Sequence, residues 1–215
     1  MYYQRNLPHW QPENAEFFIT FRLSNSLPRS TIQHIKTQKR ILEKKLENRP
    51  LDNDSSDKLS ELRNYHQTIF KKYEDQLDGA KTGPTWLNKQ KVADIVCKAI
   101  HFRDNSVYDL YAYCIMPNHV HLVLKMLQKN NNNATPALTK VLQNLKSYTA
   151  LKCNRILNRT GSFWQAESFD RVIRDEEELE STIRYVLNNP VKANLVDSWT
   201  AWPYSFCKSD FKNDF

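Results

Sequence analysis

Hydrophobic and polar residues alternate near the start of the chain, over residues 15–23 (AEFFITFRL). From Phe17 to Leu23, every second residue is apolar and would point to one side of an extended chain, while Thr20 and Arg22 would point to the other. This alternation predicts a β-strand with one buried face.

Along the rest of the chain, segments with a helical pattern alternate with segments that have an extended pattern. Composition and apolar spacing predict helices over 30–78 (interrupted near Arg49-Pro50), 87–103, 136–158 and 175–189, the last ended by Pro190. β-Branched and aromatic residues predict strands over 107–116, 119–127 and 163–173, with Met116-Pro117-Asn118 as a turn. This order indicates an α+β fold, an antiparallel sheet covered by helices mainly on one face.

Length and composition narrow the class of protein. The 215 residues favour one domain, or one domain with an insertion. A formal charge of +7 favours a polyanionic partner, because neutralising phosphates releases their counterions. We expect no signal peptide and no membrane span, since the apolar runs are too short. Three glycines exclude a GxGxxG or P-loop motif, and four cysteines without a CxxC pair are typical of reduced cytoplasmic thiols.

His119 and His121 are candidate metal ligands, because residues two apart in a strand point to the same face. Their Cα atoms would lie roughly 6.5–7 Å apart, so both imidazoles could bind one cation. Val120, between them, would point to the core. An H-x-H pair is by itself more often structural than functional. Two histidines are also too few for a zinc site, so a further ligand must come from elsewhere.

The predicted helix 175–189 offers such a partner. Asp175 and Glu178 form a capping-box pattern at its start. Tyr185 lies about 150° from the centre of the helix's apolar stripe, and Asn189 shares its face four residues later. The stripe consists of Leu179, Ile183 and Val186. A tyrosine kept for packing would lie on the stripe, although an exposed or interface tyrosine fits this geometry equally well.

Several segments, taken in order, resemble the single-tyrosine transposases of the HUH class, and among them the REP-associated tyrosine transposases. They are AEFFITFRL (15–23), YCIMPNHVHLVL (113–124), GSFWQAESFD (161–170), RYVLNNPVKANLV (184–196) and WPYS (202–205). The resemblance covers 15–23 and nearly all of 107–206. As an ordered set these motifs are far more specific than any one of them.

The resemblance implies a ferredoxin-like sheet in a single HUH domain over 1–215, with a helical insertion at about 30–85. It also implies metal-dependent nicking and strand transfer of single-stranded or hairpin DNA through a 5′-phosphotyrosine. Tyr185 takes the nucleophile's position. His119 and His121 take those of two metal ligands, and Asn189 that of the third, where the insertion-sequence transposases have Gln. Such ligands suit Mn²⁺ better than Mg²⁺, and either could be the working ion.

Basic and aromatic residues near these motifs are candidates for DNA binding: Lys146, Lys152, Arg155, Trp164, Arg171 and Arg174. Trp164 could stack on an unpaired base, or it could be a core residue. Each basic residue taken separately is equally compatible with a solvated surface charge.

Other readings of the sequence stay open. The chain could be a hairpin-binding protein without cleavage activity, or an unrelated metal hydrolase that uses the H-x-H pair. Monomer and homodimer are both compatible with the sequence. We expect a cytoplasmic location, in association with the nucleoid.

Overall fold

The computed structural model describes residues 15–47, 68, 74–78, 83–128 and 137–214. Within these ranges, five strands form one sheet in the order β4-β1-β3-β2-β5, and all neighbours pair antiparallel. The strands are β1 (Glu16–Arg22), β2 (Tyr108–Ile115), β3 (His119–Met126), β4 (Phe169–Ile173) and β5 (Ser205–Cys207). The predicted α+β antiparallel sheet is confirmed.

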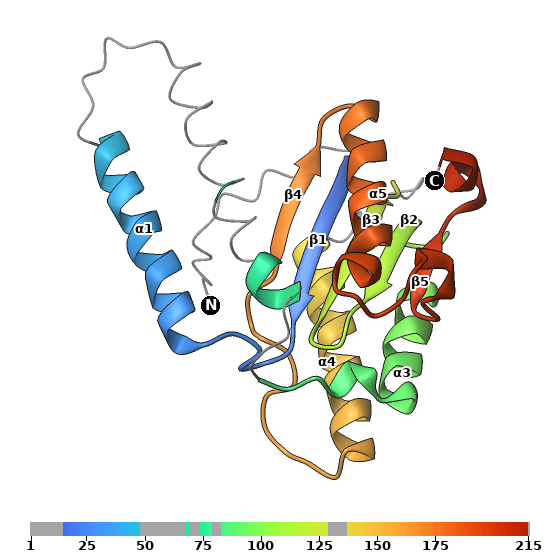
Figure 1. Cartoon of the computed structure of the whole chain (residues 1–215), viewed down its shortest axis with the longest axis horizontal. Helices are drawn as coiled ribbons and strands as arrows, with labels where there is room; N and C mark the ends of the chain where they lie inside the picture. The colour runs from blue at the N-terminus through green and yellow to red at the C-terminus, as the bar shows by residue number, and fades with distance from the viewer. Residues whose placement is uncertain (1–14, 48–67, 69–73, 79–82, 129–136, 215) are drawn as a thin grey trace.

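Helices cover both faces of the sheet (Figure 1). Two of them, α3 (Gln90–His101) and α4 (Leu138–Ile156), pack on one face, and α5 (Glu176–Lys192) packs on the other. Helix α1 (Arg29–Glu47) projects away from the sheet (Figure 1). Short 3-10 helices occupy Trp86–Asn88, Trp199–Ala201 and Ser209–Asp214.

The strands bury side chains on both faces, and this makes two apolar clusters. In β1, Phe17 and Ile19 join the cluster under α3 and α4, whereas Phe18 joins the one under α5. In β3, Leu122 joins the cluster under α3 and α4, and Val123 joins the cluster under α5. The strand alternation predicted from the sequence is therefore correct, but the second face is covered by α5 and is largely buried.

Strand β3 is central in the sheet, and its register places the histidines. His121 pairs with Thr20 of β1, and His119 pairs with Arg22. On the other side, Cys114 of β2 pairs with His121. His121 thus lies between two strands, His119 lies where β2 has just ended, and both histidines are completely buried.

Two predicted boundaries differ from the structure. Within 163–173, only Phe169–Ile173 is a strand, while Trp164 forms an isolated antiparallel bridge with Leu23 just beyond the end of β1. The last helix continues through Pro190 to Lys192. Pro190 lies in the final turn of α5. There its missing N–H removes only one backbone hydrogen bond, and the other backbone groups of the turn keep their bonds.

The remaining predicted elements agree with the structure where it describes them. Helix α1 and the helical residues 74–78 confirm parts of the predicted helix 30–78, while 48–67 and 69–73 lie outside the described residues. The predicted strands 107–116 and 119–127 correspond to β2 and β3. Strand β5, with three residues, was not predicted, because it is too short to display an alternating pattern.

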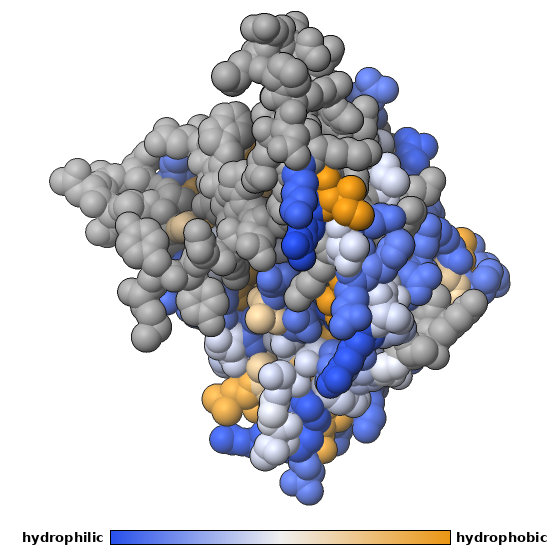
Figure 2. Space-filling model, turned by 90° about the vertical axis from the view of Figure 1, so that its left-hand side faces the viewer, coloured by the Kyte–Doolittle hydropathy of each residue, from blue (hydrophilic) through white to orange (hydrophobic). Residues whose placement is uncertain are grey.

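The surface seen in Figure 2 is mostly hydrophilic in its described part, with apolar residues in small separate groups. Among the described residues, no helix combines the length and the apolar character needed to cross a membrane.

Candidate metal and tyrosine site

The two histidines lie next to each other on the face of β3 that α5 covers, and each ring has one nitrogen bonded to a neighbour. His119 Nδ1 lies 2.6 Å from Asn118 Oδ1. His121 Nδ1 lies 2.9 Å from Thr20 Oγ1. Because the Asn118 oxygen can only accept, His119 carries a proton on Nδ1 and keeps a lone pair on Nε2. These neighbours direct both Nε2 atoms toward one place.

Nitrogen and oxygen donors gather around those Nε2 atoms, which are 2.9 Å apart. Glu74 Oε2 lies 3.0 Å from His121 Nε2. Asp78 Oδ1 lies 3.7 Å from His119 Nε2. Donor atoms of these four residues all lie within 4.8 Å of one another, so the residues could hold one metal ion. We call these four residues the donor cluster.

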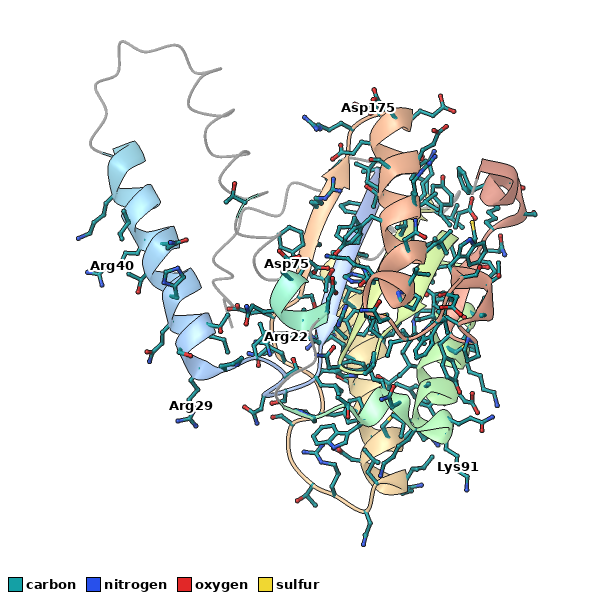
Figure 3. All side chains as sticks on the ribbon, viewed as in Figure 1. Arg22, Arg29, Arg40, Asp75, Lys91 and Asp175 are labelled. Atoms are coloured by element: carbon teal, nitrogen blue, oxygen red, sulfur yellow. The ribbon has the colours of Figure 1, made fainter. Side chains whose placement is uncertain are left out.

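Both carboxylates come from one helical turn, residues 74–78, in which the first and fifth positions share a face. Lys192 of α5 holds this turn with two ion pairs. Its ammonium lies 3.1 Å from Asp75 Oδ1 and 3.0 Å from Asp78 Oδ2. The turn therefore lies over β1, on the same side of the sheet as α5, where Figure 3 labels Asp75.

Tyr185 reaches the donor cluster from α5. Its ring packs edge-on against His121, with the ring centroids 5.6 Å apart, and against Phe18 at 6.1 Å. Its hydroxyl donates a hydrogen bond of 2.5 Å to Glu74 Oε2. Burial, together with the negative charges of Glu74 and Asp78, raises the pKa of Tyr185 above its ordinary value. The tyrosine that lies off the apolar stripe thus packs half-buried against the donor cluster.

Asn189 lies one helical turn after Tyr185 and is buried. Neither its amide oxygen nor its amide nitrogen has a hydrogen-bond partner among the described residues. An unpaired buried amide costs free energy, so such a group commonly has a ligand or ion as its partner. Its role as the third metal ligand stays a prediction.

The electrostatics of the donor cluster favour a cation. Burial raises the pKa of Asp78, although Lys192 acts in the opposite direction. Burial, assisted by His121, holds the pKa of His119 well below its ordinary value, so that imidazole is neutral. Glu74 Oε1 and Asp78 Oδ1 lack a hydrogen-bond partner within the described residues. The neutral imidazole of His119 beside buried carboxylates fits a divalent metal ion.

Three residues predicted to bind DNA lie on α4, across the sheet from the donor cluster. Besides its bond to Gln165, the Lys146 ammonium contacts Ser168 Oγ at 3.1 Å, so it fastens the segment before β4 to the helix. Lys152 and Arg155 are exposed. On this geometry α4 does not contribute to the surroundings of Tyr185.

Trp164 lies in the apolar cluster under α3 and α4 and is 6% exposed. Its indole N–H donates to Thr149 Oγ1 at 2.8 Å, and its ring packs edge-on against Phe21. The ring therefore presents no face on which a base could stack. This geometry favours the interpretation of Trp164 as a core residue over that of a residue that stacks on a base.

Arg171 and Arg174 lie on the same side of the sheet as Tyr185. Arg171 donates to Glu178 and, at 3.0 Å, to Thr182 Oγ1, and its guanidinium lies 5.2 Å from the centroid of the Phe18 ring. Arg174 is exposed and bonds to Glu178 at 2.9 Å. Among the residues predicted to bind DNA, these two arginines lie nearest to α5, the helix that carries Tyr185.

Sequence reasoning did not identify Glu74 or Asp78. They fall within the predicted helix 30–78, where acidic and basic residues are dense. Their spacing of four places both carboxylates on one helix face, but many pairs in that segment have this spacing. No local signal separates these two residues from their charged neighbours.

Comparisons with known proteins agree with this fold and identify the family. The sequence model of the family "Transposase IS200 like" matches residues 63–189, more than half of the chain, so the chain belongs to this family. Over 109 residues it is 30% identical to a Haemophilus influenzae protein assigned as a REP-associated tyrosine transposase. That match spans 49% of this chain and 62% of the relative, less than two thirds of its length.

A solved structure shares the fold. It is that of a REP-associated tyrosine transposase bound to a REP hairpin, with a TM-score of 0.51 and 15% sequence identity. The superposition covers 94% of this chain and 82% of the other. The resemblance to the REP-associated branch, first drawn from ordered motifs, is thus confirmed, and so is the fold that it implied.

Proposed function

We propose that this protein nicks and rejoins single-stranded DNA next to a hairpin, with Tyr185 as the nucleophile and a divalent metal ion bound at the histidine pair. Membership of the transposase family supports a DNA-processing role. The relative and the solved structure support REP-type hairpin DNA as the partner. The proposal rests most on one observation, the contact of Tyr185 with both His121 and Glu74.

The proposed chemistry is a transesterification. The Tyr185 hydroxyl oxygen attacks phosphorus, the bond from phosphorus to the 3′ oxygen breaks, and the proton lost by tyrosine is balanced by the one that the 3′-hydroxyl gains. The product is a 5′-phosphotyrosine, which keeps the phosphodiester energy for rejoining. A bound divalent ion would polarise the non-bridging phosphate oxygens.

This chain's residues have separate tasks in the proposal. His119, His121 and Asn189 would hold the metal ion, Mn²⁺ or Mg²⁺. Packing of Tyr185 against His121 keeps the tyrosine ring beside the histidine pair. Arg171 and Arg174 are placed to meet DNA phosphates that approach along α5, and their affinity would fall as salt rises.

The test is formation of a covalent adduct. The full chain is incubated with Mn²⁺ and an oligonucleotide in which a hairpin is flanked by single-stranded DNA. A 3′ label should move with the protein on a denaturing gel, whereas a 5′ label should not, because tyrosine retains the downstream fragment. We expect Tyr185→Phe to abolish the adduct.

The matched control is Tyr148→Phe, since Tyr148 is exposed on α4, across the sheet from the donor cluster. It should form adduct at the wild-type level. If Tyr185→Phe forms as much adduct as wild type, the nucleophile is wrong. If wild type binds hairpins without any adduct, the chain is the non-cleaving hairpin-binding protein. Phosphodiesterase activity that survives Tyr185→Phe would indicate a metal-dependent hydrolysis at the H-x-H pair that does not use this tyrosine.

Further features of the proposal come from the sequence alone. They are the single domain over 1–215 with an insertion at about 30–85, a homodimer as one of two assembly states, and association with the nucleoid. Each stays a prediction.

A further inference from the structure

The helical turn 74–78 brings chemistry to the site that the family motifs do not contain. Only 2% of Glu74 is exposed, and the Asp78 side chain is 7% exposed. Asp75, between them, has a side chain that is 51% exposed. A buried carboxylate is costly without a compensating positive charge, so this burial needs an explanation.

The turn is fixed by contacts that also orient the histidines. Leu77 is completely buried, and its carbonyl accepts a hydrogen bond of 3.0 Å from Asn118 Nδ2. The oxygen of the same Asn118 amide binds His119 Nδ1. One side chain therefore sets the direction of an imidazole and the position of the carboxylate-bearing turn.

Lys192 fixes Asp78 in a way that leaves one of its oxygens for the site. The ammonium binds Asp78 Oδ2 at 3.0 Å. Oδ1 is aimed at His119 Nε2 and has no hydrogen-bond partner among the residues described. Glu74 is similar, with Oε2 turned to His121 and Oε1 unpartnered within the described chain.

Two of the distances between donor atoms match those of adjacent metal ligands, whereas Asp78 Oδ1 lies farther away, 3.7 Å from His119 Nε2. In an octahedral site with ligands about 2.1 Å from the ion, adjacent ligand atoms lie about 3.0 Å apart. The two Nε2 atoms are 2.9 Å apart, and Glu74 Oε2 lies 3.0 Å from the second of them. A proton or a cation between the two Nε2 atoms accounts for this short distance, and the buried carboxylate of Glu74 beside them favours a cation.

From these contacts we infer that Glu74 and Asp78 are ligands of the metal ion, so that residues 74–78 are part of the metal site. This deepens the proposed function, on whose metal requirement it rests. The ligand set then contains two imidazoles and two carboxylates in addition to the proposed amide of Asn189. Glu74, which also accepts from Tyr185, links the metal position to the nucleophile.

The test measures metal binding without DNA. The full chain is stripped with a chelator and titrated with MnCl₂, and free Mn²⁺ is read from its electron paramagnetic resonance signal. We expect Glu74→Gln and Asp78→Asn each to weaken binding at least about tenfold. Asp75→Asn is the matched control, because Asp75 belongs to the same turn and pairs with Lys192 but lies outside the donor cluster. It should bind within about twofold of wild type.

A second readout guards against misfolded variants. Mn²⁺ should raise the melting temperature of wild type and Asp75→Asn, and much less that of Glu74→Gln or Asp78→Asn. The inference is overturned if both variants are folded and bind Mn²⁺ as tightly as Asp75→Asn. That result would leave the Tyr185 adduct unaffected, so its failure is distinct from failure of the proposed function.

Discussion

At the scale of single residues, the partners of the histidine rings matter as much as the rings. Thr20 and Asn118 each bind the Nδ1 atom that faces away from the donor cluster. Such contacts fix the tautomer and the orientation of a metal-binding imidazole. Both partners are completely buried, so water is not available to replace a lost contact.

We expect Thr20→Val, which keeps the shape of the side chain, to weaken Mn²⁺ binding about 10- to 100-fold, because His121 loses its Nδ1 partner. Mn²⁺ titration of the folded variant measures this. Thr149→Val is the control, since Thr149 is an equally buried threonine that bonds to Trp164 under α4. Equal Mn²⁺ affinities of the two variants would show that Thr20 does not orient His121.

At the scale of elements, α5 carries Tyr185, the proposed nucleophile, and the start of this helix is well defined. Asp175 Oδ1 accepts from the Glu178 backbone N–H at 2.8 Å, so the predicted cap is confirmed. Burial acts to raise the pKa of the Glu178 carboxyl, but bonds and charges from Arg174 and Arg171 outweigh it and lower that pKa. The first turn of α5 is thereby tied to β4.

Loss of the cap should destabilise the protein. We expect Asp175→Ala to lower the free energy of unfolding by about 1 kcal/mol, because the Glu178 N–H loses its acceptor. Urea denaturation measures this. Glu176→Ala is the control, because it also removes a negative charge from this end of the helix but Glu176 does not cap it. This variant should lose only the interaction with the helix dipole, roughly 0.3–0.5 kcal/mol of unfolding free energy. Equal losses in the two variants would mean that charge, and not the hydrogen bond, stabilises this end.

At the scale of the whole molecule, the central strand β3 belongs to both apolar clusters and to the site. Leu122 is completely buried under α3 and α4, directly after His121. The histidines thus lie on the strand that is most enclosed by packing. This explains how the site keeps its geometry although its residues come from distant parts of the chain.

We expect Leu122→Ala to lower the free energy of unfolding by about 2–5 kcal/mol, since it leaves a cavity in the core. Ile41→Ala, on the exposed face of α1, should change it by less than about 0.5 kcal/mol. Urea denaturation followed by circular dichroism compares the two. A loss below about 1 kcal/mol for Leu122→Ala would contradict a tightly packed core at β3.

By itself, the sequence determined the features that depend on local periodicity. The alternation in 15–23 defined β1, H-x-H placed two imidazoles on one face of β3, and helical spacing separated Tyr185 from the apolar stripe. These properties follow from 2-residue and 3.6-residue periods, which any short window displays. The ordered motifs also predicted the family, because their order along the chain is a property of sequence alone.

Only the tertiary structure decided which residues complete the site. Glu74 and Tyr185 are 111 positions apart, and no local pattern relates them. Their contact depends on how Asn118 and Lys192 hold the turn 74–78 against the sheet. Likewise, the burial of Trp164 and the position of α4 across the sheet follow from long-range packing. The donor cluster joins residues that are distant in the sequence, and only the complete fold brings them together.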